Sequence, residues 1–169
     1  YMLSRLNTAT LEVRTALDEY RFNDAATVLY RFIWSEFCDW GIELSKADKG
    51  SIVELGAIFK ESLKLLHPFM PFITEYLYHE LSGTKLEDSD SVMICAYPTK
   101  TKKRQKDEER FELIMDAIVS IRRAKVPIEL ANQKIEKAFI KVSNLSDEEK
   151  NIMKPFVERL AKVESVEFT

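Results

Sequence analysis

The side chains best suited to chemistry in this chain are aromatic and cationic groups gathered between positions 20 and 46. Unpaired nucleic-acid bases are held by aromatic or arginine planes and by hydrogen bonds to base edges. Candidates of these types lie at the turn 21–24 and along the segment that follows: Arg21, Phe22, Asn23, Arg31, Trp34 and Lys46. Stacking is worth about 1–3 kcal/mol per base, so this segment is the first candidate site.

Several of these residues also fit a purely structural role. Phe22 could pack at the start of the following helix, and Arg21 and Arg31 could each pair with a neighbouring acid. Phe37 and Trp40 share the apolar stripe of their segment and are predicted to be core residues. Trp34 lies off that stripe, which leaves it open between surface and core.

Two clusters of cations would suit phosphate groups. Residues 100–106 hold five basic side chains in seven positions, and a second cluster surrounds Lys125; the candidates are Lys102, Lys103, Arg104, Arg122 and Arg123. Runs of charge are more often simply solvated. If these cations do bind phosphates, each neutralised phosphate adds about −0.7 to the log–log salt slope for a single strand.

Residues for catalysis or metal binding are absent from the sequence. It has no glycine-rich phosphate loop and no Cys-x-x-Cys pair, and His67 and His79 lie twelve residues apart. His67 precedes a proline and is predicted to be structural, and His79 is predicted on a helix surface. Cys38 and Cys95 are expected to be reduced thiols. We therefore expect no catalytic residue, metal or cofactor here.

The composition is that of a globular protein outside membranes. Hydrophobic residues make up 46% and charged residues 31% of the 169 positions. No run reaches the roughly 18 apolar residues of a membrane span. The net charge of −3 means that nucleic-acid binding would need a local patch. We expect a cytoplasmic monomer.

Apolar residues at steps of three and four predict four helices, over 2–20, 24–46, 52–66 and 71–82, in an antiparallel bundle with short loops. The stripe of the first helix runs from Leu3 to Tyr20. The expected ends are an N-cap at Asn23, a capping box of Ser51 with Glu54, a break at His67-Pro68, a first turn at Pro71 and a C-terminal cap at Gly83.

The pattern changes after residue 84. Residues 92–97 are predicted to be extended, and 107–125 to be a helix. A strand over 138–142, a helix with a Ser146/Glu149 capping box and a strand over 163–168 follow. Pro155 is expected to bend or split the last helix. The tail is thus a small helix–strand–helix–strand unit.

Three motifs carry a family resemblance. The segment 30–46, with Glu36-Phe37-Cys38-Asp39-Trp40, resembles the anticodon-binding domain of valyl-tRNA synthetases. Residues 20–26 and 66–75 resemble the same family, and variants of 66–75 also occur in isoleucyl and leucyl enzymes. Gly41 departs from the pattern, since the family usually has an aromatic there. A glycine inside a helix costs about 1 kcal/mol and is expected to leave a gap.

The resemblance implies a mainly α fold: a helical anticodon-binding bundle (1–98), a basic linker (99–107) and a small α/β subdomain (108–169). It also implies recognition of the valine anticodon, with its middle adenine and third cytosine. Catalytic and editing domains of the same polypeptide, outside this chain, would then attach valine to tRNA using ATP. Two alternatives stay open, namely an isoleucyl- or leucyl-type anticodon-binding domain and a helical protein-interaction domain.

Overall fold

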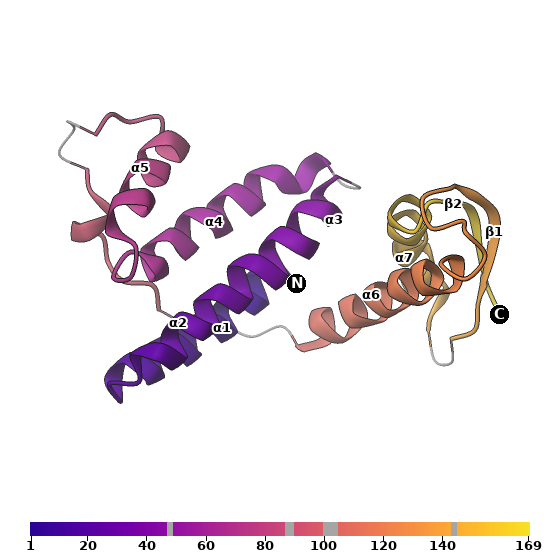
Figure 1. The fold of residues 1–169 in the computed structure, drawn as a ribbon, viewed down its shortest axis with the longest axis horizontal. Coiled ribbons are helices and arrows are strands. Elements are labelled where there is room, and N and C mark those ends of the chain that lie inside the picture. Colours follow the sequence, from indigo (N-terminus) through magenta and orange to yellow (C-terminus); the bar gives the residue numbers. More distant parts are fainter. Residues whose placement is uncertain (47–48, 87–89, 100–104, 143–144) are drawn as a thin grey trace. The chain divides into compact units, whose positions relative to one another are not determined.

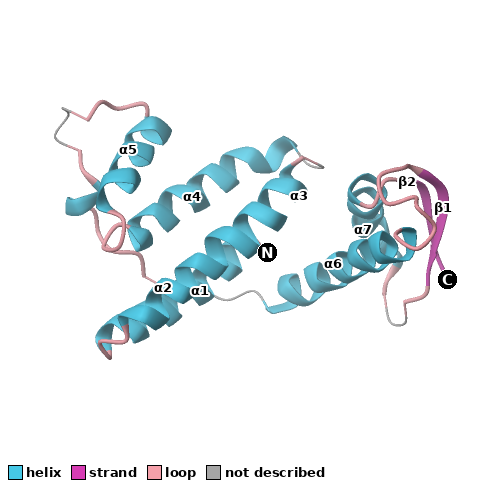
Figure 2. Cartoon of the chain, viewed as in Figure 1, coloured by secondary structure: helices cyan, strands magenta, loops and turns pink. Residues whose placement is uncertain are grey.

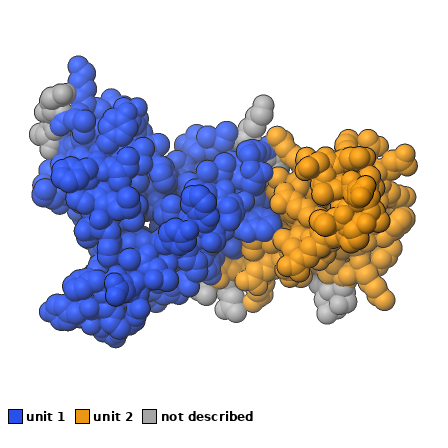
Figure 3. All heavy atoms as spheres, in the orientation of Figure 1, with its two compact units in different colours: residues 1–104 blue, residues 105–169 orange. Residues whose placement is uncertain are grey.

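The computed structural model describes all residues except 47–48, 87–89, 100–104 and 143–144. The chain divides into two compact units, residues 1–104 and residues 105–169 (Figure 3). Helices dominate the first unit, and the second combines helices with two strands (Figure 2). The predicted mainly α class with a small α/β part is therefore confirmed.

The first unit is built from one long helical rod and its neighbours (Figure 1). The rod comprises α2 (Phe22–Tyr30), a π-helix (Arg31–Ile42) and α3 (Glu43–Ser45). It packs on α1 (Met2–Asp18), and α1 in turn packs on α4 (Ile52–Leu66). After the break at His67 and Pro68, α5 (Pro71–Ser82) follows, and Gly83 ends it in the left-handed region with φ 66°.

The core of this unit joins α1, the rod and α4. Its members share near-complete burial and apolar side chains: Leu6, Ala9, Val13, Ala16, Ala25, Leu29, Phe32, Phe37, Ile58 and Leu65. Phe32 and Phe37, five residues apart, are both buried, which suits the i to i+5 bonding of a π-helix. The 3.6-residue period had placed Phe32 off the main stripe, and that prediction was wrong.

The predicted ends of three helices need correction. Tyr20 is not on the core face, because it stands in a turn with φ 57° and is 80% exposed. Asn23 is no N-cap, since α2 already begins at Phe22. Ser51 makes no side-chain cap hydrogen bond, because it lies in a 3₁₀ turn (Lys49–Ser51) with helical φ and ψ. Leu3, at the other end of the predicted stripe of α1, is also exposed.

A return segment closes the first unit beyond α5. Residues predicted to be extended instead begin with a 3₁₀ turn (Val92–Ile94), whose first amide donates to Glu75. Tyr97 is anchored to α4, where its hydroxyl donates to the Leu65 carbonyl at 3.1 Å, and burial raises the pKa of Tyr97 to about 12. Pro98 accepts a hydrogen bond from Arg14 of α1 at 3.2 Å.

The second unit follows the predicted order of helix, strand, helix and strand. It contains α6 (Gln105–Lys125), β1 (Ile135–Ile140), α7 (Asp147–Leu160) and β2 (Val163–Phe168). The strands pair in parallel, with Ile135 opposite Val163 and Ile140 opposite Phe168. The first strand starts three residues earlier than predicted. Its buried side chains come from both helices and from β2, for example Ile118, Val157 and Val166.

The ends of α7 are fixed by charge. The Ser146 hydroxyl and the Glu149 carboxylate form the predicted capping box at its start. At its end, Arg122 of α6 donates from Nε at 3.2 Å and from Nη2 at 2.8 Å to the Leu160 carbonyl. Pro155 lies inside a single continuous helix, so the predicted splitting does not occur. Among the described residues, no helix has both the length and the apolar character to cross a membrane.

Candidate nucleic-acid interface

Exposed aromatic rings line one face of the rod formed by α2 and the π-helix. Phe22 is 56% exposed, Tyr30 66% and Trp34 59%. The Tyr30 and Trp34 rings lie nearly parallel, with centroids 6.3 Å apart and an interplanar angle of 8°. At the start of the rod, Phe22 packs edge-on against Tyr20 with centroids 6.3 Å apart. These rings therefore present flat faces to solvent, as base stacking requires.

The pairing of Arg21 with nearby acids is confirmed by its contacts. Its guanidinium bonds to Glu19 at 2.6–2.7 Å and to Asp24. These side-chain hydrogen bonds, that from Asp24 first, raise the pKa of Arg21 above its ordinary value. All three side chains are about half exposed, so the cluster can exchange partners with a phosphate at little desolvation cost.

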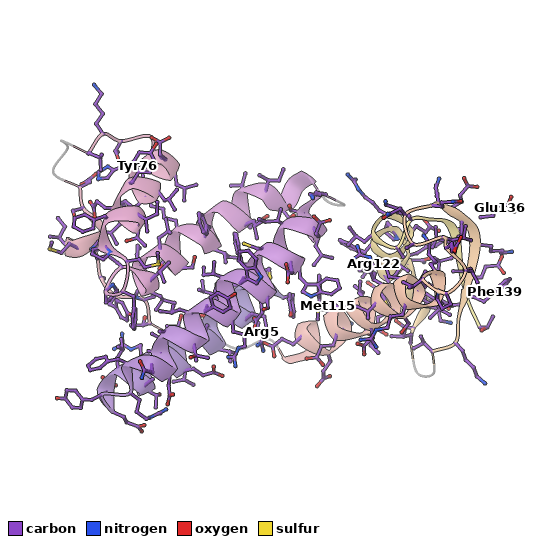
Figure 4. All side chains as sticks on the ribbon, viewed as in Figure 1. Arg5, Tyr76, Met115, Arg122, Glu136 and Phe139 are labelled. Carbon is purple, nitrogen blue, oxygen red and sulfur yellow. The ribbon has the colours of Figure 1, made fainter. Side chains whose placement is uncertain are left out.

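Arg31 belongs to a charge network between α1 and the rod. Its Nη2 atom lies 2.5 Å from Glu12 Oε2, and its Nε atom lies 3.7 Å from Glu36 Oε1. Glu36 itself receives two hydrogen bonds of 2.8 Å from Arg5, whose place on α1 is marked in Figure 4. Arg31 is 49% exposed, whereas Glu36 is only 13% exposed. Glu36 is thus an internal anchor, and Arg31 remains at the surface.

The other predicted contacts lie in different places. Asn23 is exposed in the first turn of α2, where its carbonyl accepts a hydrogen bond from Thr27. Lys46 follows α3, far along the rod from Phe22, and pairs with Glu43. The structure therefore brings Phe22, Asn23, Tyr30 and Trp34 onto one rod, and it does not bring Lys46 into the same cluster.

The predicted phosphate contacts are only partly described. Lys102, Lys103 and Arg104 lie outside the described residues. Arg123 is exposed in the last turn of α6. Arg122, marked in Figure 4, bonds to the Leu160 carbonyl and so already has a structural role. Lys125 is buried and caps the carbonyls of Gln133 and Ala161.

The signature residues around Glu36 build the rod. Phe37 is buried, with its ring 5.1 Å from that of Phe59, as predicted. Trp40 is only half-buried. Gly41 leaves no gap, contrary to the prediction, because a Cβ there would lie 3.3 Å from Leu55 Cδ1 and 3.4 Å from Met2 Sδ. The glycine therefore allows α1 and α4 to approach the rod closely.

The histidines have structural partners. Nδ1 of His67 lies 2.7 Å from the Thr74 hydroxyl, which fixes the turn before α5, as predicted. His79 was predicted at the surface and is in fact 3% exposed, between the Thr84 hydroxyl at 2.7 Å and Glu75 at 3.2 Å. The described residues contain no group of three or more His, Cys, Asp or Glu side chains placed to bind a metal ion.

Comparison with known proteins places the chain in a class. Residues 1–140 match the family model described as the anticodon-binding domain of tRNA ligase, and the chain belongs to that family.

Its relatives then narrow the class. The chain is 59% identical over 167 residues to the valine–tRNA ligase of Wolinella succinogenes and 60% identical over 168 residues to that of Nitratiruptor sp.. It is 56% identical over 172 residues to that of Campylobacter jejuni. These matches cover 99–100% of this chain and 18–20% of the relatives, so it spans about a fifth of their length. The resemblance to the valine type, predicted from the Glu36–Trp40 signature, is confirmed.

Sequence reasoning missed one residue of the aromatic face, Tyr30. A usable signal existed, because Tyr30 and Trp34 are four residues apart and therefore neighbours on a helix surface. The stripe of the rod was assigned with Leu29 and Ile33 inward, and Tyr30 was left without a role. Its ring, parallel to that of Trp34, is the additional component that the structure supplies.

Proposed function

We propose that this chain recognises the anticodon of valine tRNA by stacking unpaired bases on the aromatic face of the α2–π-helix rod. The observation that supports this most is the exposure of Phe22, Tyr30 and Trp34 along one helix, with Arg21 and Arg31 beside them. Loops whose bases can be splayed out are what proteins read sequence-specifically in RNA. Asn23 is the side chain on this face that can hydrogen-bond a base edge.

The role is binding and positioning, and the chemistry belongs to other parts of the same polypeptide. A catalytic domain would attach valine to the tRNA using ATP, and an editing domain would accompany it. The parent protein is proposed to be a cytoplasmic valine–tRNA ligase, and this region is proposed to act as a monomer. The family to which residues 1–140 belong supports this assignment.

Phosphates are proposed to contact Lys102, Lys103, Arg104 and Arg123, with Arg122 as the weakest member because Leu160 already engages it. Each contact should contribute about −0.7 to the log–log salt slope. Replacing Arg123 by glutamine should make the slope shallower by that amount, and replacing Arg122 should also loosen the end of α7. Binding isotherms at several salt concentrations, with thermal unfolding in parallel, separate the two effects.

The rival function is a helical protein-interaction domain. The observation favouring it is the apolar surface of α5, where Phe72 is 91%, Tyr76 49% and Ile73 44% exposed. This rival requires that the Phe22–Trp34 face be irrelevant to RNA. Binding of the chain to the anticodon stem-loop of valine tRNA, compared between the wild-type chain and a Phe22→Ala variant, decides between the two. A loss of affinity of about 5-fold or more supports anticodon reading.

A further inference from the structure

A groove of about 540 Å³ lies beside the Tyr30–Trp34 pair. One wall is formed by the junction of α2 and the π-helix, with Thr27, Tyr30 and Trp34. The opposite wall is the end of α4 and the turn after it, with Leu66, Phe69 and Met70. The sequence motif 66–75 and the segment 30–46 therefore meet at one feature of the surface. Both walls belong to the first compact unit.

The shape and chemistry of this groove suit a flat, largely apolar ring system. Its volume falls within the roughly 300–1,000 Å³ of small-molecule pockets, which are lined mainly by apolar and aromatic side chains with a few polar groups. Here the Thr27 hydroxyl and the Tyr30 hydroxyl are the polar groups on an otherwise apolar lining. The two rings leave the wall already parallel, so a third ring could extend the stack without rearrangement.

Features along the rod point to a nucleobase as the occupant. Asn23, Thr27, Tyr30 and Trp34 recur at steps of four, three and four, and all four are exposed, so they form one stripe. The stripe extends for about 16 Å at 1.5 Å per residue. Arg21 precedes it and Arg31 lies within it, so a cation stands near each part of the stripe. Phosphates on either side of an inserted base would meet these cations, which an apolar protein segment would not need.

We propose that this groove binds one unstacked nucleobase of the RNA loop, with its face against the Tyr30–Trp34 pair. The inference rests on the proposed function and adds a residue, Tyr30, and a second wall, Phe69 and Met70, to it. Arg31, the residue after Tyr30, is the cation available to the adjoining phosphate. The groove thereby makes the loop deliver a base to a fixed point on the rod.

The first test uses the intrinsic fluorescence of Trp34. The chain has two tryptophans, so a Trp40→Phe variant leaves Trp34 alone. This variant is titrated with the anticodon stem-loop of valine tRNA and with loops that each lack one base at a single position. We expect quenching with the intact loop and loss of quenching with the base missing at one position only. Equal quenching by every loop would overturn the inference.

The second test changes the groove. Tyr30→Ala removes one ring, and Ala26→Leu fills the groove while both rings stay, which guards against a folding artefact because residue 26 is exposed on the rod. Both variants should weaken stem-loop binding by about 5- to 150-fold, the loss of one stacked base. They should not weaken binding of the loop that lacks the critical base. Phe72→Ala, an aromatic 91% exposed on α5, is the matched control and should bind like wild type.

The outcomes separate this inference from the proposed function. If the chain distinguishes anticodons while Tyr30→Ala and Ala26→Leu bind like wild type, the groove assignment is wrong and anticodon reading stands. If the chain binds no stem-loop at all, both are wrong. If sedimentation shows a dimer that the Tyr30→Ala change abolishes, the groove holds a second copy of the chain, and the nucleobase assignment is overturned.

Discussion

Removing the Glu36 side chain should destabilise the first unit more than removing any of its exposed ion pairs. Glu36 accepts two hydrogen bonds of 2.8 Å from Arg5, and the side chains are 13% and 24% exposed. This contact ties α1 to the π-helix over a separation of 31 residues. In a Glu36→Ala variant, Arg5 would keep its charge and lose this carboxylate.

The size of the effect follows from the partial burial. Exposed ion pairs contribute about 0–1 kcal/mol, and breaking a fully buried pair from one side costs about 3–5 kcal/mol. Because both groups retain some solvent contact, the expected cost lies between these limits, at about 2 kcal/mol. With a urea slope of about 2 kcal/mol/M, the midpoint of unfolding should fall by roughly 1 M.

Tryptophan fluorescence during urea unfolding is the appropriate assay. Both tryptophans, Trp34 and Trp40, lie in the π-helix, so the signal reports on the first unit alone. The matched control is Glu43→Ala, which breaks the exposed pair with Lys46 and should cost no more than about 1 kcal/mol. If Glu36→Ala unfolds at the same urea concentration as Glu43→Ala, the anchoring role of Glu36 is refuted.

Three further predictions concern charge and burial. Glu12→Gln should raise the affinity for the stem-loop, because it releases Arg31 for phosphate; Arg31→Gln should lower it and make the salt slope about 0.7 shallower. Isotherms at several salt concentrations measure both, and an unchanged affinity in Glu12→Gln contradicts the competition. The backbone amide of Ser146, then its hydroxyl and Arg110, lowers the pKa of Glu149. A lowered folded-state pKa stabilises above the unfolded value, about 4.3, and this stabilisation is lost as pH falls through the folded value. Thermal unfolding between pH 6 and 3 should therefore show a smaller pH dependence in Glu149→Gln, and an identical profile contradicts this. His79→Ala should cost about 1–3 kcal/mol in urea unfolding because it leaves two partners unsatisfied in a buried site; a wild-type midpoint contradicts it.

Periodicity predicted the helices well because it reports directly on burial. The breaks at Pro68 and the cap at Gly83 were also predictable, since proline and glycine restrict or permit the backbone itself. The caps at Asn23 and Ser51 were not, because a cap depends on where the chain leaves the helical region. Tyr20 and the 3₁₀ turn at Ser51 set those points.

The candidate site was partly predictable for a similar reason. Trp34 lies off the apolar stripe in sequence and is exposed in the structure. The burial of His79 was beyond a single-helix pattern, because Thr84 and the return segment at Val92 supply its surroundings. The groove also needed the fold, since Leu66 and Phe69 reach Tyr30 only when α4 packs beside the rod.

The most direct test of anticodon recognition compares binding of this chain to valine tRNA and to the same tRNA with its middle anticodon base changed, at two salt concentrations. The proposed function predicts weaker binding of the changed tRNA at both concentrations, with a difference that salt does not remove, because stacking and edge contacts carry it. Equal affinity for the two tRNAs at both concentrations would contradict anticodon recognition by this chain.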